Sequence, residues 1–267
     1  MSPLWRDEVA IYLAPRKLAL VRRARGLKAR VVATTELAVS SGAAGDLGPV
    51  LARLAGVLTD SAWHGAAARV VVADQSWARY AIVPWTATRL DAAGRLTHAR
   101  YVLGDAHGEA VAGWAVTLAD GPPGHSCVAC AMPAALRGAL EDTLAPARLS
   151  LLSLQPKLVV AFNAFRHRLT GDDAWFVTLD DGSLSAVHLS GGRWDRVHLA
   201  RLSPDPTVEL ERLRAFGTLT GGAGSPCRMF VDAPAWMRGG ASKGFEWLEA
   251  ADGGQAHELA LLRGMRA

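Results

Sequence analysis

The chain has 267 residues, of which half are apolar and 20% are charged. This length and apolar fraction can supply one large or two ordinary domain cores, so we expect a globular protein. No stretch approaches the roughly 20 consecutive apolar residues that a membrane-spanning helix needs, and the first residues show no cleavable secretory signal. The expected compartment is the cytoplasm.

Strands and helices are predicted to alternate along the first part of the chain. The expected strands are 8–13, 17–23, 29–39, 68–73, 79–84, 114–118, 127–131 and 148–153. We expect a helix over 46–58, where apolar residues recur at spacings of three and four, and further helices over 90–103 and 133–144, the last opened by Pro133. Strands 68–73 and 79–84 follow one another closely, so we expect a hairpin or a bent pair there.

The second part of the chain repeats the beginning of the first. Residues 174–202 show the strand–turn–strand–turn–strand pattern that residues 8–39 also show. Before this repeat we expect a helix over 158–168, and after it a helix over 206–219, a core strand over 228–232 and a final strand or helix beyond Lys243. The repetition indicates an internal duplication, with a mixed five-stranded sheet in each of two lobes. We place the lobes at residues 1–155 and 156–267.

Basic residues gather near the N-terminus of a chain whose net charge is +4. The cluster comprises Arg16, Lys17, Arg22, Arg23, Arg25, Lys28 and Arg30. It is either a face for nucleic acid or an anionic membrane, or the solvent side of a hairpin. We favour the hairpin and expect no nucleic-acid partner, because no interleaved aromatic residues accompany these charges. Nucleic-acid binding, if present, predicts a steep salt dependence.

Cysteines and histidines offer two candidate chemistries. Cys127 and Cys130 form a CxxC pair, but residues three apart on a strand point to opposite faces, so a redox or zinc site is disfavoured. Cys227 leaves the three cysteines without a full disulfide framework. His188 and His198 are placed to meet across the second meander, where histidines on a solvent face are the commoner arrangement. We predict no metal site.

Nine tryptophans are too many to assign to the core without question. Trp77 and Trp85 flank an apolar strand, and Trp85 follows the proline that ends it. Tryptophan is enriched at the residues that dominate protein interfaces. Trp77 and Trp85 are therefore candidate partner-binding residues, each half-exposed, and core packing is the alternative for each.

Two segments resemble a known family. VVVADQSWARYAIVPW (70–85) reads as a strand, a short turn and a strand ending in proline, and RLSLLSLQPKLVVAFNAFR (148–166) as a strand, a proline turn and a helix. With the duplicated meanders, this order resembles the actin-like proteins of bacterial type IV pilus and type II secretion platforms, the PilM and GspL group. The resemblance implies a two-lobed actin-like (ribonuclease H-like) α/β fold, with ATP between the lobes in PilM-like members and little or no nucleotide in GspL-like ones.

The resemblance also implies where a nucleotide would be held, and two of three such elements are lost. In the first hairpin, IYLAPRKLALV, Tyr12 stands in place of an aspartate that organises Mg²⁺ and Ala14 in place of a glycine. Pro15 removes a backbone donor. The glycine pair expected after the last core strand is replaced by residues 232–234, Asp-Ala-Pro.

The second hairpin, LDDGSLS, keeps more of the pattern. Asp180, Gly182 and Ser183 lie where the second phosphate loop would be, and Asp180 or Asp181 is placed to hold Mg²⁺ through water. The alternative, which we favour, is an ordinary turn that uses Asp and Gly for their backbone preferences. We expect no cofactor, with weak Mg-ATP binding as the alternative.

These observations lead to a main functional hypothesis and an alternative. The main one is a noncatalytic actin-like scaffold of a type IV pilus or type II secretion apparatus. It would dock a peptide or the cytoplasmic tail of a membrane partner on an exposed strand edge or in the cleft, and so lie peripherally at the inner membrane. The alternative is a nucleotide-binding ATPase or sugar-kinase relative with a divergent cleft.

Overall fold

The computed structural model describes ten segments of the chain. They are residues 7–24, 26, 30–40, 45–169, 173–180, 182–203, 205–220, 227–237, 244–248 and 257–264, with backbone alone described at 217–220, 257, 260, 263 and 264. Contacts divide the chain into two compact units, each made of separate segments. Unit 1 comprises residues 1–77, 134–160 and 250–267, and unit 2 comprises residues 78–133 and 161–249.

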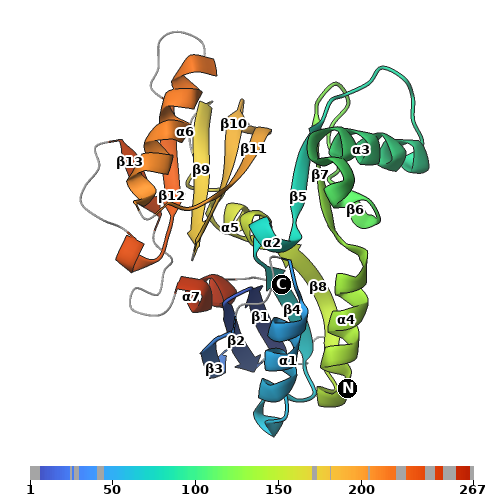
Figure 1. Cartoon of the computed structure of the whole chain (residues 1–267), viewed down its shortest axis with the longest axis vertical. Helices are drawn as coiled ribbons and strands as arrows, with labels where there is room; N and C mark the ends of the chain where they lie inside the picture. The colour runs from blue at the N-terminus through green and yellow to red at the C-terminus, as the bar shows by residue number, and fades with distance from the viewer. Residues whose placement is uncertain are drawn as a thin grey trace. The chain divides into compact units, whose positions relative to one another are not determined.

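A five-stranded mixed sheet forms the centre of unit 1, in the order β3-β2-β1-β4-β8 (Figure 1). Its strands are β1 (Glu8–Ala14), β2 (Lys17–Ala24), β3 (Arg30–Ala38), β4 (Ala67–Val72) and β8 (Ser150–Pro156). The first three form an antiparallel meander, while β4 runs parallel to β1 and β8. Every residue of β1 is buried, as expected for a strand covered on both faces.

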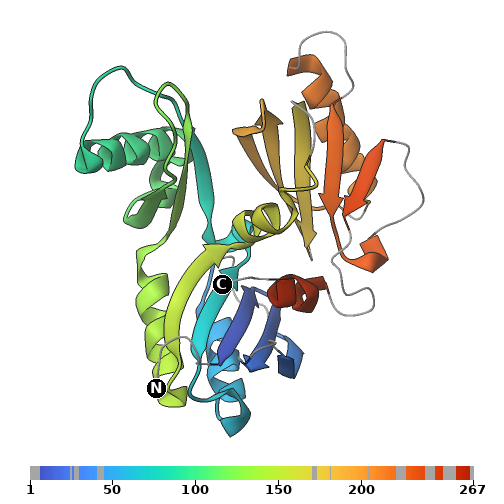
Figure 2. The same cartoon turned by 180° about the vertical axis from the view of Figure 1, so that it is seen from behind.

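The helices of unit 1 come from distant parts of the chain. They are α1 (Gly48–Val57), α2 (Asp74–Trp77), α4 (Ala134–Leu144) and α7 (His257–Gly264). Helices α1 and α4 contact each other, and α7, red in Figures 1 and 2, lies against the blue strands β1 and β2. Leu261 and Leu262 of α7 are buried. Each contributes about 2 kcal/mol relative to an exposed leucine, so unit 1 is held together by residues from both ends of the chain.

Unit 2 contains the second five-stranded sheet, in the order β11-β10-β9-β12-β13. Its strands are β9 (Asp173–Asp180), β10 (Ser183–Ser190), β11 (Arg193–Arg201), β12 (Arg228–Asp232) and β13 (Phe245–Leu248). The meander is again antiparallel, and β12 is parallel to β9 and β13. Helix α6 (Pro206–Thr220) packs its Leu210 and Leu213 into the core of this sheet.

A smaller sheet in unit 2 has the order β5-β7-β6 and is entirely antiparallel. It comprises β5 (Arg79–Val83), β6 (Trp114–Leu118) and β7 (Cys127–Pro133), with helix α3 (Ala92–His107) packed against it (Figure 1). Ala99 and Leu103 of α3 meet Ala81, Val83 and Ala129 of the strands in one buried cluster. Along the chain, the boundary between the two units falls within helix α5 (Lys157–Phe165), after residue 160. Short 3₁₀ turns occupy Ser61–Trp63, Gly108–Val111, Ala145–Ala147 and Ala235–Met237.

The mixed sheet with a meander in each half confirms the predicted α/β duplication. The expected hairpin of strands 68–73 and 79–84 is wrong, because β4 pairs with β1 and β8 whereas β5 pairs with β7 in another sheet. The compact units also differ from lobes divided at 155/156, because residues 78–133 belong with the second sheet and α7 with the first. None of the described helices is both long and apolar enough to span a bilayer.

Candidate functional site

The first hairpin carries a buried aromatic ring where the resemblance implies a nucleotide, and a buried cation from α5 lies beside that ring. Tyr12 is fully buried near the end of β1, and the Lys157 ammonium lies 5.6 Å from the centroid of its ring. The Lys157 side chain is itself 1% exposed, so its charge is not presented to a ligand in solvent. A second cation such as Mg²⁺ would be repelled at short range by this ammonium.

Asp74, the first residue of α2, stabilises the start of α5, where Lys157 also lies. Its two carboxylate oxygens accept from the backbone N–H of Leu158, at 2.9 and 3.1 Å, at the start of α5. A carboxylate at a helix N-terminus is favourable because it satisfies an unpaired donor and opposes the helix dipole. The residue is 3% exposed. This buried acid therefore serves the fold of unit 1.

The second hairpin positions its three candidate residues at a tight turn in unit 2. Asp180 ends β9 and Ser183 begins β10, and the two are register partners across the turn. Gly182 has a φ of +77°, a conformation that glycine adopts without strain. Asp180 is buried, and Asp181 lies outside the described residues. The positive φ that the turn requires explains Gly182 without a nucleotide. Asp232, which stands where the resemblance implies a glycine pair after the last core strand, is also buried.

The two candidate tryptophans differ sharply in exposure. Trp77 is fully buried, and its indole N–H donates to the carbonyl of Gly45 at 3.1 Å. The expectation that Trp77 is half-exposed for a partner is therefore wrong, because α2 turns this side chain into the core of unit 1. Trp85 is 53% exposed. It remains a candidate contact residue.

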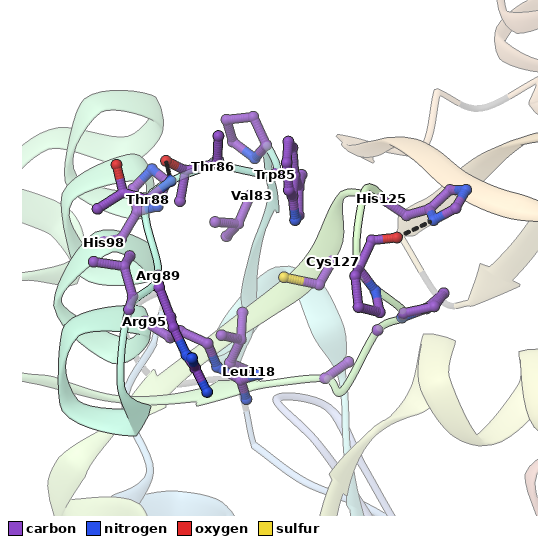
Figure 3. Close-up of a pocket in the computed structure, with 17 residues that line it drawn as sticks. Val83, Trp85, Thr86, Thr88, Arg89, Arg95, His98, Leu118, His125 and Cys127 are labelled. Atoms are coloured by element: carbon purple, nitrogen blue, oxygen red, sulfur yellow. Dashed lines mark hydrogen bonds between the residues drawn. The ribbon is translucent and has the colours of Figure 1, made fainter.

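Trp85 lines a pocket in unit 2, which we call the Trp85 pocket (Figure 3). Its walls are the end of β5 and the loop after it (83–90), Arg95 and His98 of α3, and the segment 118–127 that joins β6 to β7. The volume is about 370 Å³. Three prolines stiffen the two loops, because each fixes one backbone dihedral: Pro84, Pro122 and Pro123.

The lining of the Trp85 pocket is apolar and basic. Arg89, Arg95, His98 and His125 contribute nitrogen donors, and none of the lining residues is acidic. Arg95 bonds Asp120 at 3.2 Å, but that carboxylate is 96% exposed and screened by water. The pocket is therefore suited to a ligand that is negatively charged and partly apolar.

Cys127 also faces this pocket, with its sulfur directed towards the middle in Figure 3. Burial raises the pKa of its thiol, the positive charge of Arg95 opposes that rise and Asp120 adds to it. The neutral thiol is a poor nucleophile, because the thiolate is the reactive form. Cys127 and Cys130 are free, so the CxxC pair forms no disulfide.

Most described members of the N-terminal basic cluster have partners within unit 1. Arg22 binds Asp7 at 2.8 Å, and Arg23 binds Glu8 at 3.2 Å. Lys17 lies between Glu36 and Glu258. Arg25 and Lys28 lie outside the described residues. These pairs favour the structural interpretation of the cluster.

The chain is similar to known proteins in its fold and not in its sequence. No protein-family model matches the sequence, and no curated protein matches it significantly. The fold is nevertheless similar to a chain of the PilM–PilN type IV pilus biogenesis complex, with a TM-score of 0.67 and 18% identity over 96% of each chain. The fold is actin-like.

Two further solved structures support this assignment of the fold. The cytoplasmic domain of EpsL, an inner-membrane component of the type II secretion system of Vibrio cholerae, aligns over 97% of this chain and 94% of its own. The TM-score is 0.62 and the identity 9%. A Bacteroides thetaiotaomicron protein with an actin-like ATPase fold aligns over 98% of this chain and 99% of its own, with a TM-score of 0.62 and 9% identity.

The sequence singled out Trp85 as a candidate contact residue but did not predict the pocket that it lines. The segment 119–126, which contributes Pro122, Pro123 and His125, read only as a loop. Arg89 and Arg95 carried no motif. Prolines and basic residues do cluster in the sequence after β5 and between β6 and β7. This pattern indicates a shared pocket only when the strand order β5-β7-β6 is known.

Proposed function

We propose that this protein is a noncatalytic actin-like docking component of a bacterial type IV pilus or type II secretion apparatus. It binds an acidic, partly apolar segment of a protein partner in the Trp85 pocket. The partner segment is a peptide or cytoplasmic tail of an inner-membrane protein of the apparatus, so the protein works at the cytoplasmic side of that membrane without needing a span of its own.

The Trp85 pocket is the observation that carries this proposal. An indole that is 53% exposed at the mouth of a pocket can bury a large apolar area on binding. Arg89 and Arg95 supply planar guanidinium groups that bind carboxylates through paired hydrogen bonds. The indole would anchor an apolar side chain of the partner, and the two guanidinium groups would favour acidic residues next to that side chain.

The similarity in fold supports the proposal that the protein belongs to a pilus or secretion apparatus. The solved structures with the same fold over almost the whole chain include a chain of a PilM–PilN complex and the cytoplasmic domain of an inner-membrane secretion component. We extend that setting to this chain as part of the proposal.

We propose that the protein is noncatalytic because the first hairpin lacks groups that would bind phosphate and Mg²⁺. A tyrosine ring beneath the Lys157 ammonium replaces the carboxylate that would organise Mg²⁺. Pro15 provides no N–H for a phosphate in the turn that follows β1. The actin-like fold would then serve to carry the small sheet and its pocket.

The test is a binding titration with fluorescein-labelled peptides that represent cytoplasmic segments of pilus and secretion inner-membrane proteins. Trp85→Ala and Arg89→Ala should each weaken binding of the recognised peptide about tenfold or more, a loss of roughly 1.4 kcal/mol or more. Replacing the peptide's Glu and Asp by Gln and Asn should weaken binding similarly, and added salt should reduce it.

Trp236→Ala is the matched control, because Trp236 is 74% exposed in unit 2 and does not line the pocket. This variant should leave the affinity unchanged. Equal losses for Trp85→Ala and Trp236→Ala would overturn the assignment of the pocket. ATP hydrolysis abolished by Asp180→Ala would instead favour the ATPase alternative.

A further inference from the structure

Three metal-ligating side chains meet at one end of the second sheet, away from the residues assigned above. Asp173 is the first residue of β9, and Cys227 immediately precedes β12, which is parallel to β9. His188 lies near the end of β10, which is antiparallel to β9. One donor atom from each of the three lies within 4.8 Å of the other two. The sheet register, rather than proximity in sequence, brings them together.

The donor atoms are buried and lie close to one another. His188 and Cys227 are each 6% exposed. His188 Nε2 lies 2.6 Å from Asp173 Oδ1, yet neither atom makes a hydrogen bond of acceptable geometry with any described residue. Buried polar atoms are nearly always satisfied. A cation bound by both atoms would satisfy them together.

The other nitrogen of the His188 ring is held by a carboxylate. The register of β10 and β11 shifts between His188 and Leu189, so that Asp195 is an extra residue on β11. Such a bulge redirects a side chain, and here Asp195 Oδ2 lies 3.3 Å from His188 Nδ1. An Nδ1–H that donates to a carboxylate leaves Nε2 as the acceptor, which is the arrangement that orients metal-binding histidines.

Trp175 forms an apolar wall beside the cluster. It is the register partner of His188 on β9, and the two ring centroids are 5.0 Å apart. Trp175 is 1% exposed. Contact with this buried ring restricts the orientation of the imidazole.

We propose that Asp173, His188 and Cys227 form a zinc site. A carboxylate oxygen, an imidazole nitrogen and a thiolate sulfur are all ligands that Zn²⁺ accepts, and three protein ligands leave a fourth tetrahedral position for water. The charges of one carboxylate and one thiolate balance those of the ion. Bound zinc would tie together β9, β10 and β12, the three central strands of the second sheet.

Zinc binding requires a small rearrangement of side chains. With metal–ligand distances of about 2.0 to 2.3 Å, tetrahedral ligands lie roughly 3.4 Å apart. The 2.6 Å contact between Asp173 and His188 must therefore open by about 0.8 Å, while the sulfur approaches from within 4.8 Å. Asp173 is placed for this movement, because its side chain is 39% exposed at the strand start.

The competing interpretation is an imidazole held between two carboxylates without a metal. Both interpretations use Asp173, His188 and Asp195, but only the zinc site uses the Cys227 sulfur. Cobalt(II) added to the purified, metal-stripped protein distinguishes them, because a thiolate ligand gives an intense near-ultraviolet charge-transfer band and a tetrahedral site gives strong visible bands. We expect one cobalt per chain with both signals, and displacement of the cobalt by one equivalent of zinc.

Substitutions test the ligand assignment. Cys227→Ser preserves the size of the side chain and should remove the charge-transfer band, whereas Cys127→Ser and Cys130→Ser should keep it. Asp195→Asn changes a half-exposed residue and should weaken zinc binding about 10- to 100-fold through its effect on the His188 orientation.

Circular dichroism and thermal unfolding establish that each variant is folded before its affinity is compared. Weak binding without the charge-transfer band, or binding unchanged in Cys227→Ser, would overturn the proposal. A band that persists in Cys227→Ser but disappears in Cys127→Ser would place the metal at the other cysteines and would overturn it equally.

Discussion

The ammonium nitrogen of Lys17 lies 2.7 Å from a carboxylate oxygen of Glu258, 241 residues further along the chain. The same ammonium lies 3.0 Å from Glu36 on β3. Glu258 is 1% exposed, so its charge depends on this partner. Together with the bond from Arg23 to the carbonyl of Leu262 at 2.8 Å, the pair holds α7 on the first sheet.

Removing Lys17 should destabilise unit 1 more than an ordinary surface substitution does. Lys17→Met leaves Glu258 buried without its cation, and we expect the free energy of unfolding in urea to fall by about 2 to 3 kcal/mol. Arg137→Met is the control, because the Arg137–Glu141 pair on α4 is exposed and should contribute less than about 0.5 kcal/mol. Equal losses would show that the α7 contact is unimportant.

The same pair predicts a pH dependence. Burial pushes the pKa of Lys17 down, but the hydrogen bonds and charges of Glu258 and Glu36 outweigh it, so the pKa lies above its ordinary value of 10.5. A raised folded-state pKa means that the contribution is complete below about pH 10.5 and is lost as the pH rises through the folded-state value. The stability difference between wild type and Lys17→Met should stay constant from about pH 7 to 10 and shrink above that range. A difference that disappears near neutral pH would contradict this.

The two tryptophans beside β5 should behave oppositely on truncation. Trp77→Ala opens a cavity in unit 1 and removes the donor to Gly45, so the free energy of unfolding should fall by about 3 to 5 kcal/mol. Trp85→Ala removes a half-exposed ring and should cost less than about 1 kcal/mol. Denaturant titrations of both variants measure this, and a larger loss for Trp85→Ala would mean that its ring packs as core.

Mg-ATP should leave the thermal unfolding midpoint unchanged. A ligand present at a hundred times its dissociation constant stabilises a folded protein by about 2.7 kcal/mol, which a thermal scan detects readily. We expect no such shift at millimolar nucleotide, because Tyr12 and Pro15 replace phosphate- and metal-binding groups. A clear shift that Asp180→Ala abolishes would show that the second hairpin alone retains a nucleotide.

The meanders were predictable from sequence because their information is local. Short strands joined by tight turns fix their own pairing, and the Asp-Gly turn before Ser183 needs only the positive φ of Gly182. The bounds of α4 (Ala134–Leu144) and α6 (Pro206–Thr220) also agree with the predicted 133–144 and 206–219 to within one residue. The predictions that the structure confirms are therefore those that depend on interactions between residues within about ten positions of one another.

The contacts that define the candidate sites were not local. Strand β5 pairs with β7, about 45 residues later, rather than with the adjacent β4, and no pattern in either strand specifies that choice. The ligands of the zinc cluster are separated by 15 and 39 residues and match no spacing motif. Trp77 and Trp85 have similar surroundings in sequence. Their different exposure follows from the packing of α2, which buries Trp77.

The position of α7 has a consequence for synthesis. Unit 1 begins at the first residues but needs residues 257–264, so the ribosome must translate that helix before the unit can close. The strands and helices of unit 2 lie between residues 78 and 249 and are available earlier. Domains usually mature in the order in which they emerge. In this chain the unit that starts first is completed last.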